Sequence, residues 1–184
     1  MKITRKTALS SIFGSLLAIP SFGKKPKSKD LEEFRTEFLQ AWARSEEYTL
    51  KLFNQVKPEL LDYKYTPESF SFRTQFVHCI VFNSLQLCGR LNVPNPYKDK
   101  NNSHWSALSK EQLAEELKGF YQFVGTLVKN ADDKTLMKEH GFSGGPIPMW
   151  RLFYAMENHI IHHRGQALCY LRLNGITPEG FVGW

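Results

Sequence analysis

The sequence predicts an all-α protein built from four long helices. In four segments the apolar residues recur every three or four positions, which is the spacing of an amphipathic helix. Proline, glycine and helix-capping residues separate these segments. No run alternates apolar and polar residues clearly enough to predict a strand, so no sheet is expected. The chain has 184 residues, of which 42% are apolar, enough for one domain with its own core.

The first helix is expected from Asp30 to Val56. Asp30 is a suitable N-cap, and Pro58 ends the helix. The apolar residues at helical spacing are Leu31, Phe34, Phe38, Trp42, Leu52, Phe53 and Val56.

The second helix is expected from Thr66 to about Leu91. Thr66 followed by Pro67 is a typical helix start, because proline is favoured in the first helical position. One stripe of this helix contains Thr74, His78, Val81, Leu85 and Cys88. His78 is therefore expected on a largely apolar face.

The third helix is expected from Ser109 to Asn130, between two long loops. Ser109 and Gln112 fit a capping box at its start. The residues expected to face inward are Leu113, Leu117, Phe120, Tyr121, Val124, Leu127 and Val128. The polar loop 92–107 precedes this helix, with His104 in solvent and Trp105 against a bundle end. The glycine-rich loop 132–148 follows it, with His140 exposed, and is a candidate rim over a functional site.

The fourth helix is expected from Met149 to Leu173, with Asn174 and Gly175 at its end. Gly165 lies inside this helix, where glycine costs on the order of 1 kcal/mol relative to alanine. A glycine at this position suggests close approach by a neighbouring helix.

Two histidines of the fourth helix have the spacing of a metal chelate. His159 and His163 are four residues apart, so their imidazoles lie on one face about one turn from each other. His78, within the second helix, is the best candidate for a third ligand. The alternative for His78 is a core histidine bonded to the backbone or to a neighbouring side chain. Ile160 excludes the His-Glu-x-x-His zinc-protease pattern, because it replaces the glutamate.

The residues around this pair also resemble a known family. The chain reads His159, His162, His163, Arg164, Gly165 and Gln166, followed by Tyr170-Leu-Arg-Leu-Asn-Gly175. This run resembles the late motif of the DinB-like family, and the resemblance extends over about residues 30–184. It implies a four-helix bundle in up-down-down-up order with a three-histidine metal site. The family pattern favours His159 and His163 as ligands, while a pair of His159 and His162 is also geometrically possible.

Three neutral imidazoles suit zinc, nickel, iron, manganese or copper, and leave coordination positions open as in a catalytic site. The leading hypothesis is a metal-dependent hydrolase or, as the resemblance implies for some members, a thiol-dependent S-transferase. The expected partners are a small-molecule substrate and, for a transferase, a thiol cosubstrate. A non-catalytic metal-binding or ligand-binding bundle and a purely structural bundle are the alternatives. No catalytic residue is assigned, and a homodimer is left open.

The net charge and the cysteines limit the functions that the sequence supports. The net charge of +6 falls to +3 without residues 1–23, too small a surplus to indicate a nucleic-acid-binding face. The cysteines, Cys79, Cys88 and Cys169, lie inside expected helices and are interpreted as buried free thiols. Cys79 is a poor fourth ligand, because neighbouring residues on a helix point about 100° apart.

The N-terminal segment has the order of an export signal. Residues 1–23 combine a basic start, a short apolar stretch and a small-residue end, which predicts a periplasmic or extracellular protein. The apolar stretch is too short to remain as a membrane span. Arg5 and Lys6 also fit a degenerate twin-arginine signal, so the export route stays open. The alternative to both export signals is a frayed, amphiphilic N-terminal tail. Residues 24–30 are expected to form a basic linker before the domain at 31–184.

Overall fold

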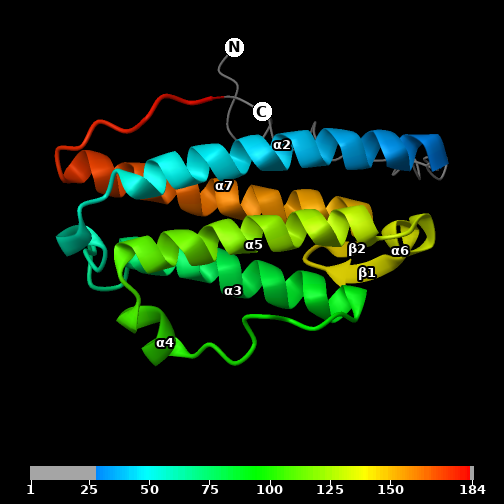
Figure 1. The fold of residues 1–184 in the computed structure, drawn as a ribbon, viewed down its shortest axis with the longest axis horizontal. Helices are drawn as coiled ribbons and strands as arrows, with labels where there is room; N and C mark the ends of the chain where they lie inside the picture. Colours follow the sequence, from blue (N-terminus) through cyan, green and yellow to red (C-terminus); the bar gives the residue numbers. More distant parts are fainter. Residues whose placement is uncertain (1–27, 183–184) are drawn as a thin grey trace, which may run out of the picture.

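The computed structural model describes residues 28–182, which contain four long helices and several short elements (Figure 1). The export signal predicted at residues 1–23 lies outside this range. The long helices are α2 (Ser28–Asn54), α3 (Phe72–Leu91), α5 (Lys110–Asn130) and α7 (Met149–Leu173). None of the helices in residues 28–182 has the length and apolar character needed to span a membrane.

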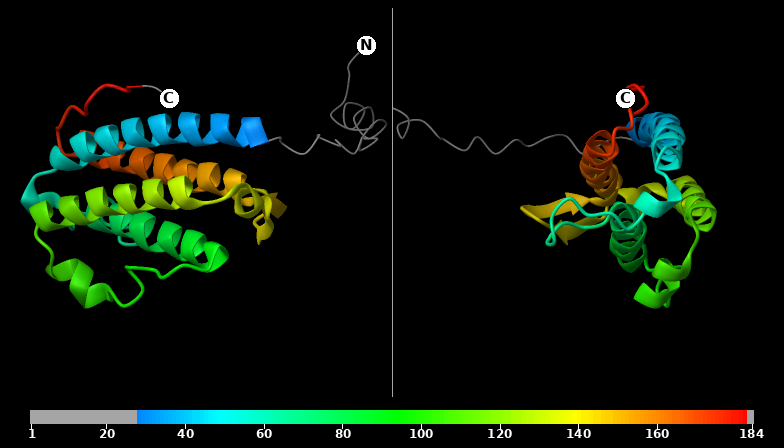
Figure 2. Two further views of the ribbon diagram at one scale, coloured as in Figure 1. Left: turned by 45° about the vertical axis from the view of Figure 1, so that its right-hand side comes forward. Right: turned by 90° about the vertical axis from the view of Figure 1, so that its left-hand side faces the viewer.

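The four long helices form a bundle in up-down-down-up order. Helices α2 and α7 run in one direction, and α3 and α5 run in the opposite direction (Figure 1). The most extensive contacts join α3 to α7 and α2 to α5, so each helix packs mainly on an antiparallel neighbour. Figure 2 shows the same bundle nearly end-on, with the four helices around one core. The predicted bundle fold is confirmed.

Aromatic side chains fill much of the core. The ring of Phe38 stacks on Trp42 with 5.5 Å between centroids, and Trp42 packs against Tyr121 at 4.6 Å. Trp42 Nε1 donates to the backbone oxygen of Tyr121 over 2.8 Å, which satisfies its buried N–H and links α2 to α5.

The start of α3 differs from the predicted start at Thr66. The helix begins at Phe72, and Ser71 is its N-cap, with Oγ accepting from the Thr74 N–H over 3.1 Å. The segment before it folds back on the preceding turn, because the Arg73 N–H donates to Leu61 O over 2.7 Å. These tertiary bonds hold residues 61–71 outside the helix.

The stripe predicted for α3 is also wrong in part. The buried face carries Phe72, Phe76, Ile80 and Leu87, whereas Leu85 is 59% exposed. His78 lies at the edge of the buried face and is only partly buried. It stands beside α7 rather than in the centre of the core.

Both long loops contain regular structure. The first contains α4 (Asn102–Ala107), on which Trp105 is buried, and it joins the parallel helices α3 and α5. The second contains α6 (Asp133–Met137) and an antiparallel hairpin of β1 (Glu139–Phe142) and β2 (Gly145–Pro148). The expectation of no sheet was therefore wrong. Gly144 and Gly145 make the hairpin turn with φ of 92° and 130°, values that favour glycine.

The remaining helix boundaries follow local sequence signals. Ser109 and Gln112 form the predicted capping box of α5. Helix α7 spans the predicted residues, and Gly175 follows it with φ of 73°. Helix α2 begins at Ser28, so the last residues of the predicted linker are helical and Asp30 lies in the first turn. A short 3-10 helix, η1 (Pro58–Leu60), follows α2.

Two expectations for α7 are wrong. Gly165 is exposed, and a side-chain methyl group built there would meet no neighbouring atom within 4 Å. Close helix approach therefore does not explain it. Cys169 is an exposed free thiol, unlike Cys79 and Cys88, which are buried and free as expected.

Candidate metal centre

Three histidines from two helices meet between α3 and α7. His78, His159 and His163 each offer a ring nitrogen, and these three atoms lie within 4.8 Å of one another. The ring centroid of His78 is 5.0 Å from that of His159 and 4.8 Å from that of His163. The structure thus brings together the residues that the sequence predicted as a group.

Asn83 determines which nitrogen of His159 carries the proton. The Nδ2 amide of Asn83 donates to the backbone oxygen of Met156 over 3.0 Å. That carbonyl can only accept, so Asn83 Oδ1 is the atom that faces His159 Nδ1, 2.8 Å away. His159 Nδ1 must donate this bond. Its Nε2 then carries a lone pair.

Gln75 has the same role for His163. Its Oε1 lies 2.5 Å from His163 Nδ1, and its Nε2 donates to Gln166 Oε1 over 3.0 Å. The Tyr170 hydroxyl donates to the backbone oxygen of Phe70, so its oxygen is available to accept from Gln75 Nε2. Both contacts orient the Gln75 oxygen towards His163. His163 therefore also presents an unprotonated Nε2.

The two unprotonated nitrogens face each other. His159 Nε2 and His163 Nε2 are 3.0 Å apart, a distance at which two lone pairs repel unless a cation lies between them. Two imidazole nitrogens bound to one zinc ion at about 2.0–2.1 Å are roughly 2.9–3.4 Å apart at usual coordination angles. The arrangement therefore fits a shared metal ion.

The environment keeps the imidazoles neutral. Burial, together with the nearby His78 and His162, lowers the pKa of His159 to about 4. Burial and the neighbouring histidines lower the pKa of His163 to about 3, and burial also lowers the pKa of His78. At neutral pH all three rings are in the neutral form, which has one nitrogen free to bind a metal.

Two phenylalanine rings pack against the histidines of the cluster. Phe70, before α3, lies parallel to the His163 ring at 6.2 Å and lies 5.4 Å from His78. Phe82, one turn beyond His78, is 5.4 Å from His78 and 4.7 Å from His159. These rings form the rim of the site.

The loop 132–148 does not form the rim predicted for it. Its hairpin packs at the start of α7, where Arg90 donates to Gly141 O over 2.8 Å. Met149, at that end of α7, is about 15 Å along the helix from His159.

The remaining histidines lie outside the cluster. His162 is exposed on α7, where its Nε2 lies 2.8 Å from Gln166 Nε2. His104 is partly buried beside Trp105, and His140 is on β1. Cys79 points into the core, where burial raises the pKa of its thiol, so it is not a fourth ligand.

A buried polar cluster supports α7 on the side facing α2. Arg164 donates to Ser45 Oγ over 3.0 Å and to Thr49 Oγ1 over 3.1 Å, and its guanidinium lies over the Tyr48 ring. The hydroxyl of Tyr121 bonds to the same serine and threonine. Arg164 therefore links α7 to a neighbouring helix, as the sequence suggested.

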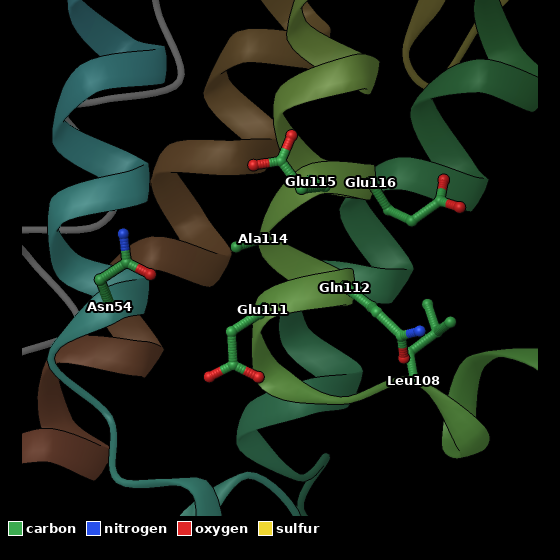
Figure 3. A pocket seen from close by; sticks show the side chains of 7 residues that line it. All are labelled: Asn54, Leu108, Glu111, Gln112, Ala114, Glu115 and Glu116. Atoms are coloured by element: carbon green, nitrogen blue, oxygen red, sulfur yellow. The ribbon is translucent and has the colours of Figure 1, made fainter.

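A separate depression of about 750 Å³ lies at the start of α5, away from the histidines (Figure 3). Its lining residues are Asn54, Leu108, Glu111, Gln112, Ala114, Glu115 and Glu116. Glu111 accepts from Ser109 Oγ at the helix cap, and Glu116 pairs with Lys100. These carboxylates already have structural partners, and the depression offers no comparable set of metal ligands.

Sequence reasoning missed the residues that orient and surround the histidines. Gln75 and Asn83 are fully buried polar residues on α3, three positions before and five after His78. Their presence within an apolar helix was an available signal, since buried amides need partners. Phe70 and Phe82 gave no comparable signal, because aromatic residues are common in any core.

The fold and the histidine cluster define a helical bundle with a candidate metal centre between two antiparallel helices. The chain matches the model of the DinB superfamily over residues 41–167 and belongs to that family.

The chain is also similar to individual proteins of known sequence or structure. The protein YrdA of Bacillus subtilis, described as uncharacterized, is 25% identical over 150 residues, covering 79% of this chain and 86% of YrdA. The crystal structure of the DinB-like protein YjoA from Bacillus subtilis superposes with a TM-score of 0.63 at 17% identity, covering 79% of this chain and 96% of YjoA. A DinB-like protein from Bacillus cereus gives a TM-score of 0.61 at 25% identity, covering 78% and 95%.

Proposed function

We propose that this DinB-family protein binds one divalent metal ion through His78, His159 and His163. The observation that carries the proposal is the pair of unprotonated Nε2 atoms 3.0 Å apart. Hydrogen bonds to Asn83 and Gln75 leave those lone pairs without a proton, and the lowered pKa values keep them so at neutral pH. The donor set of three imidazoles suits zinc, nickel, iron, manganese or copper.

The chemistry of the site follows from its open side. A metal held by three protein ligands would act as a Lewis acid, polarising a bound substrate or acidifying a bound water or thiol. The residues of the chain orient the imidazole rings and place apolar side chains beside them. Asn83 and Gln75 fix two rings, and Phe70 and Phe82 pack against the cluster. We therefore favour a metal-dependent hydrolase or thiol-dependent S-transferase.

Metal analysis of the purified protein tests the proposal. The protein should be produced without a histidine tag and its metal content measured by mass spectrometry. We expect close to one equivalent of one transition metal per chain, removed by a chelator and restored by titration. A metal-free protein that gains no thermal stability from any of the candidate metals would contradict the proposal.

A non-catalytic metal-binding or ligand-binding protein is the second candidate. The exposed site edge beside Phe70 suits a binder. A screen of the metal-loaded protein with esters, amides and thiol-acceptor pairs separates the two functions. Turnover that disappears with the metal indicates an enzyme, and ligand-induced stabilisation without turnover indicates a binder.

We also propose export of the mature protein. The proposal rests on the order of basic, apolar and small residues in segment 1–23. Mass spectrometry of the native protein should give an N-terminus near Lys24. Cytosolic protein that retains Met1 would contradict it.

A further inference from the structure

The outer edge of the histidine cluster is apolar and open. Phe70 is 43% exposed although its ring contacts two histidines. Phe82 is partly buried and contacts His78 and His159. Leu85 continues this strip of α3, since it lies two turns from His78 on the same helix face and is 59% exposed. A molecule that reaches the histidines therefore passes over apolar side chains.

Polar contacts to the cluster within residues 28–182 come from uncharged amides. His159 bonds to Asn83 and His163 to Gln75. The described contacts to the three rings are with amides, phenylalanines and other histidines, and none of them involves a lysine, arginine or carboxylate. A charged group on a ligand beyond the atom bound to the metal would therefore find no opposite charge among these contacts to replace its lost hydration.

From these observations we propose that the metal site takes a small molecule that carries an aromatic or similarly bulky apolar group next to its metal-binding atom and no charged group beyond that atom. The donor atom would occupy the open side of the three-histidine site, and the apolar group would lie between Phe70 and Phe82. This inference rests on the proposed metal function and adds the class of ligand to it. Covering roughly 55 Å² of phenyl surface at about 25 cal/mol per Å² corresponds to a tenfold gain in affinity.

Three thiols that share one donor atom provide the test. Protein loaded with Co²⁺ is titrated with phenylmethanethiol, 2-mercaptoethanol and 2-mercaptoethanesulfonate, and the thiolate-to-cobalt absorption is followed. We expect phenylmethanethiol to bind about tenfold more tightly than 2-mercaptoethanol. The sulfonate should bind no more tightly than 2-mercaptoethanol. Equal affinities, or tighter binding of the sulfonate, would overturn the inference.

Variants separate this inference from the metal site itself. Phe70→Ala and Phe82→Ala should reduce the preference for the phenyl thiol to about threefold or less while Co²⁺ still binds at one equivalent. If Phe82→Ala does not fold, the thiol preference is measured in Phe82→Leu, which keeps the core packed. Phe181→Ala is the matched control, because Phe181 is 78% exposed and contacts Tyr48 of α2 rather than the histidines.

The possible failures are distinguishable. A protein that binds no Co²⁺ contradicts the proposed metal function. A protein that binds Co²⁺ but keeps its thiol preference in both phenylalanine variants contradicts the inference alone. If Phe70→Ala instead changes the oligomeric state measured by sedimentation, the rings serve a protein interface and the inference is also wrong.

Discussion

The carboxamide of Asn83 joins α3 to α7 through two atoms, with Nδ2 3.0 Å from the Met156 carbonyl and Oδ1 2.8 Å from Nδ1 of His159. The first bond orients the amide, and the second sets the tautomer of the histidine. The direction of the His159 lone pair thus depends on a backbone carbonyl one turn away on the same helix. Metal affinity should therefore depend on residues that do not touch the metal.

We expect Asn83→Leu to weaken metal binding by about 10–100-fold without unfolding the bundle, as is typical when a residue that orients a metal ligand is removed. Leucine cannot accept the His159 N–H, so the ring can rotate or change tautomer. Isothermal titration of the metal-free protein measures the loss. Ser84→Ala is the control, because Ser84 is equally buried on α3 and has no bond to a histidine. Equal affinity in wild type and Asn83→Leu would show that the amide is not needed.

The metal-free protein should lose stability as the pH falls from about 6.5 towards 4. The pKa of His159 is lowered to about 4 and that of His163 to about 3, whereas both titrate near 6.5 in the unfolded chain. Between these values the unfolded state binds more protons, so the free energy of unfolding decreases as the pH decreases. Urea unfolding between pH 4 and pH 8 provides the measurement. The double variant His159→Gln, His163→Gln should show a smaller slope, and an unchanged slope would contradict the lowered pKa values.

Arg164→Met should destabilise the fold by about 2–4 kcal/mol, since it removes charged hydrogen bonds to two buried hydroxyl groups. Ser45 and Thr49 would retain only their bonds to the Tyr121 hydroxyl. Urea unfolding measures the change. Arg172→Met, at an exposed position of the same helix, should change stability by less than about 0.5 kcal/mol. Similar effects of the two changes would show that the buried cluster is not important for stability.

Alanine at two glycines should have opposite effects. Gly165→Ala should stabilise the protein by roughly 0.5–1 kcal/mol, because the site is helical, exposed and has free space around it. Gly175→Ala should destabilise it by about 1 kcal/mol, because φ is 73° there. Thermal unfolding of the two variants measures both stability changes. A destabilising Gly165→Ala would indicate a contact that residues 28–182 do not contain.

Sequence alone predicted the features that depend on local patterns. The capping box at Ser109 and the end of α7 at Gly175 rest on bonds within a few residues, so they can be read from the chain. The predicted start of α3 at Thr66 was wrong, because Arg73 and Phe72 donate their backbone N–H groups to the preceding turn instead. That choice depends on how residues 61–63 pack, which no local signal specifies.

In the candidate site, too, local patterns could be predicted from the sequence and tertiary contacts could not. His159 and His163 were predicted together because helical spacing alone brings them to one face. His78 was correctly placed near them, since an imidazole in an apolar helix requires a partner. Gln75 and Asn83 could not be assigned to particular histidines, because their contacts depend on the register between α3 and α7.

The central claim is that His78, His159 and His163 bind one metal ion as a unit. The most direct measurement is metal titration of six single variants, followed by bound metal and thermal unfolding. We expect His78→Ala, His159→Ala and His163→Ala to lose most of the bound metal, because two imidazoles hold an ion far more weakly than three. We expect His104→Ala, His140→Ala and His162→Ala to bind like the wild type. Loss of binding in His162→Ala with retention in His163→Ala would contradict the ligand assignment, and wild-type binding in all six variants would exclude the histidine site.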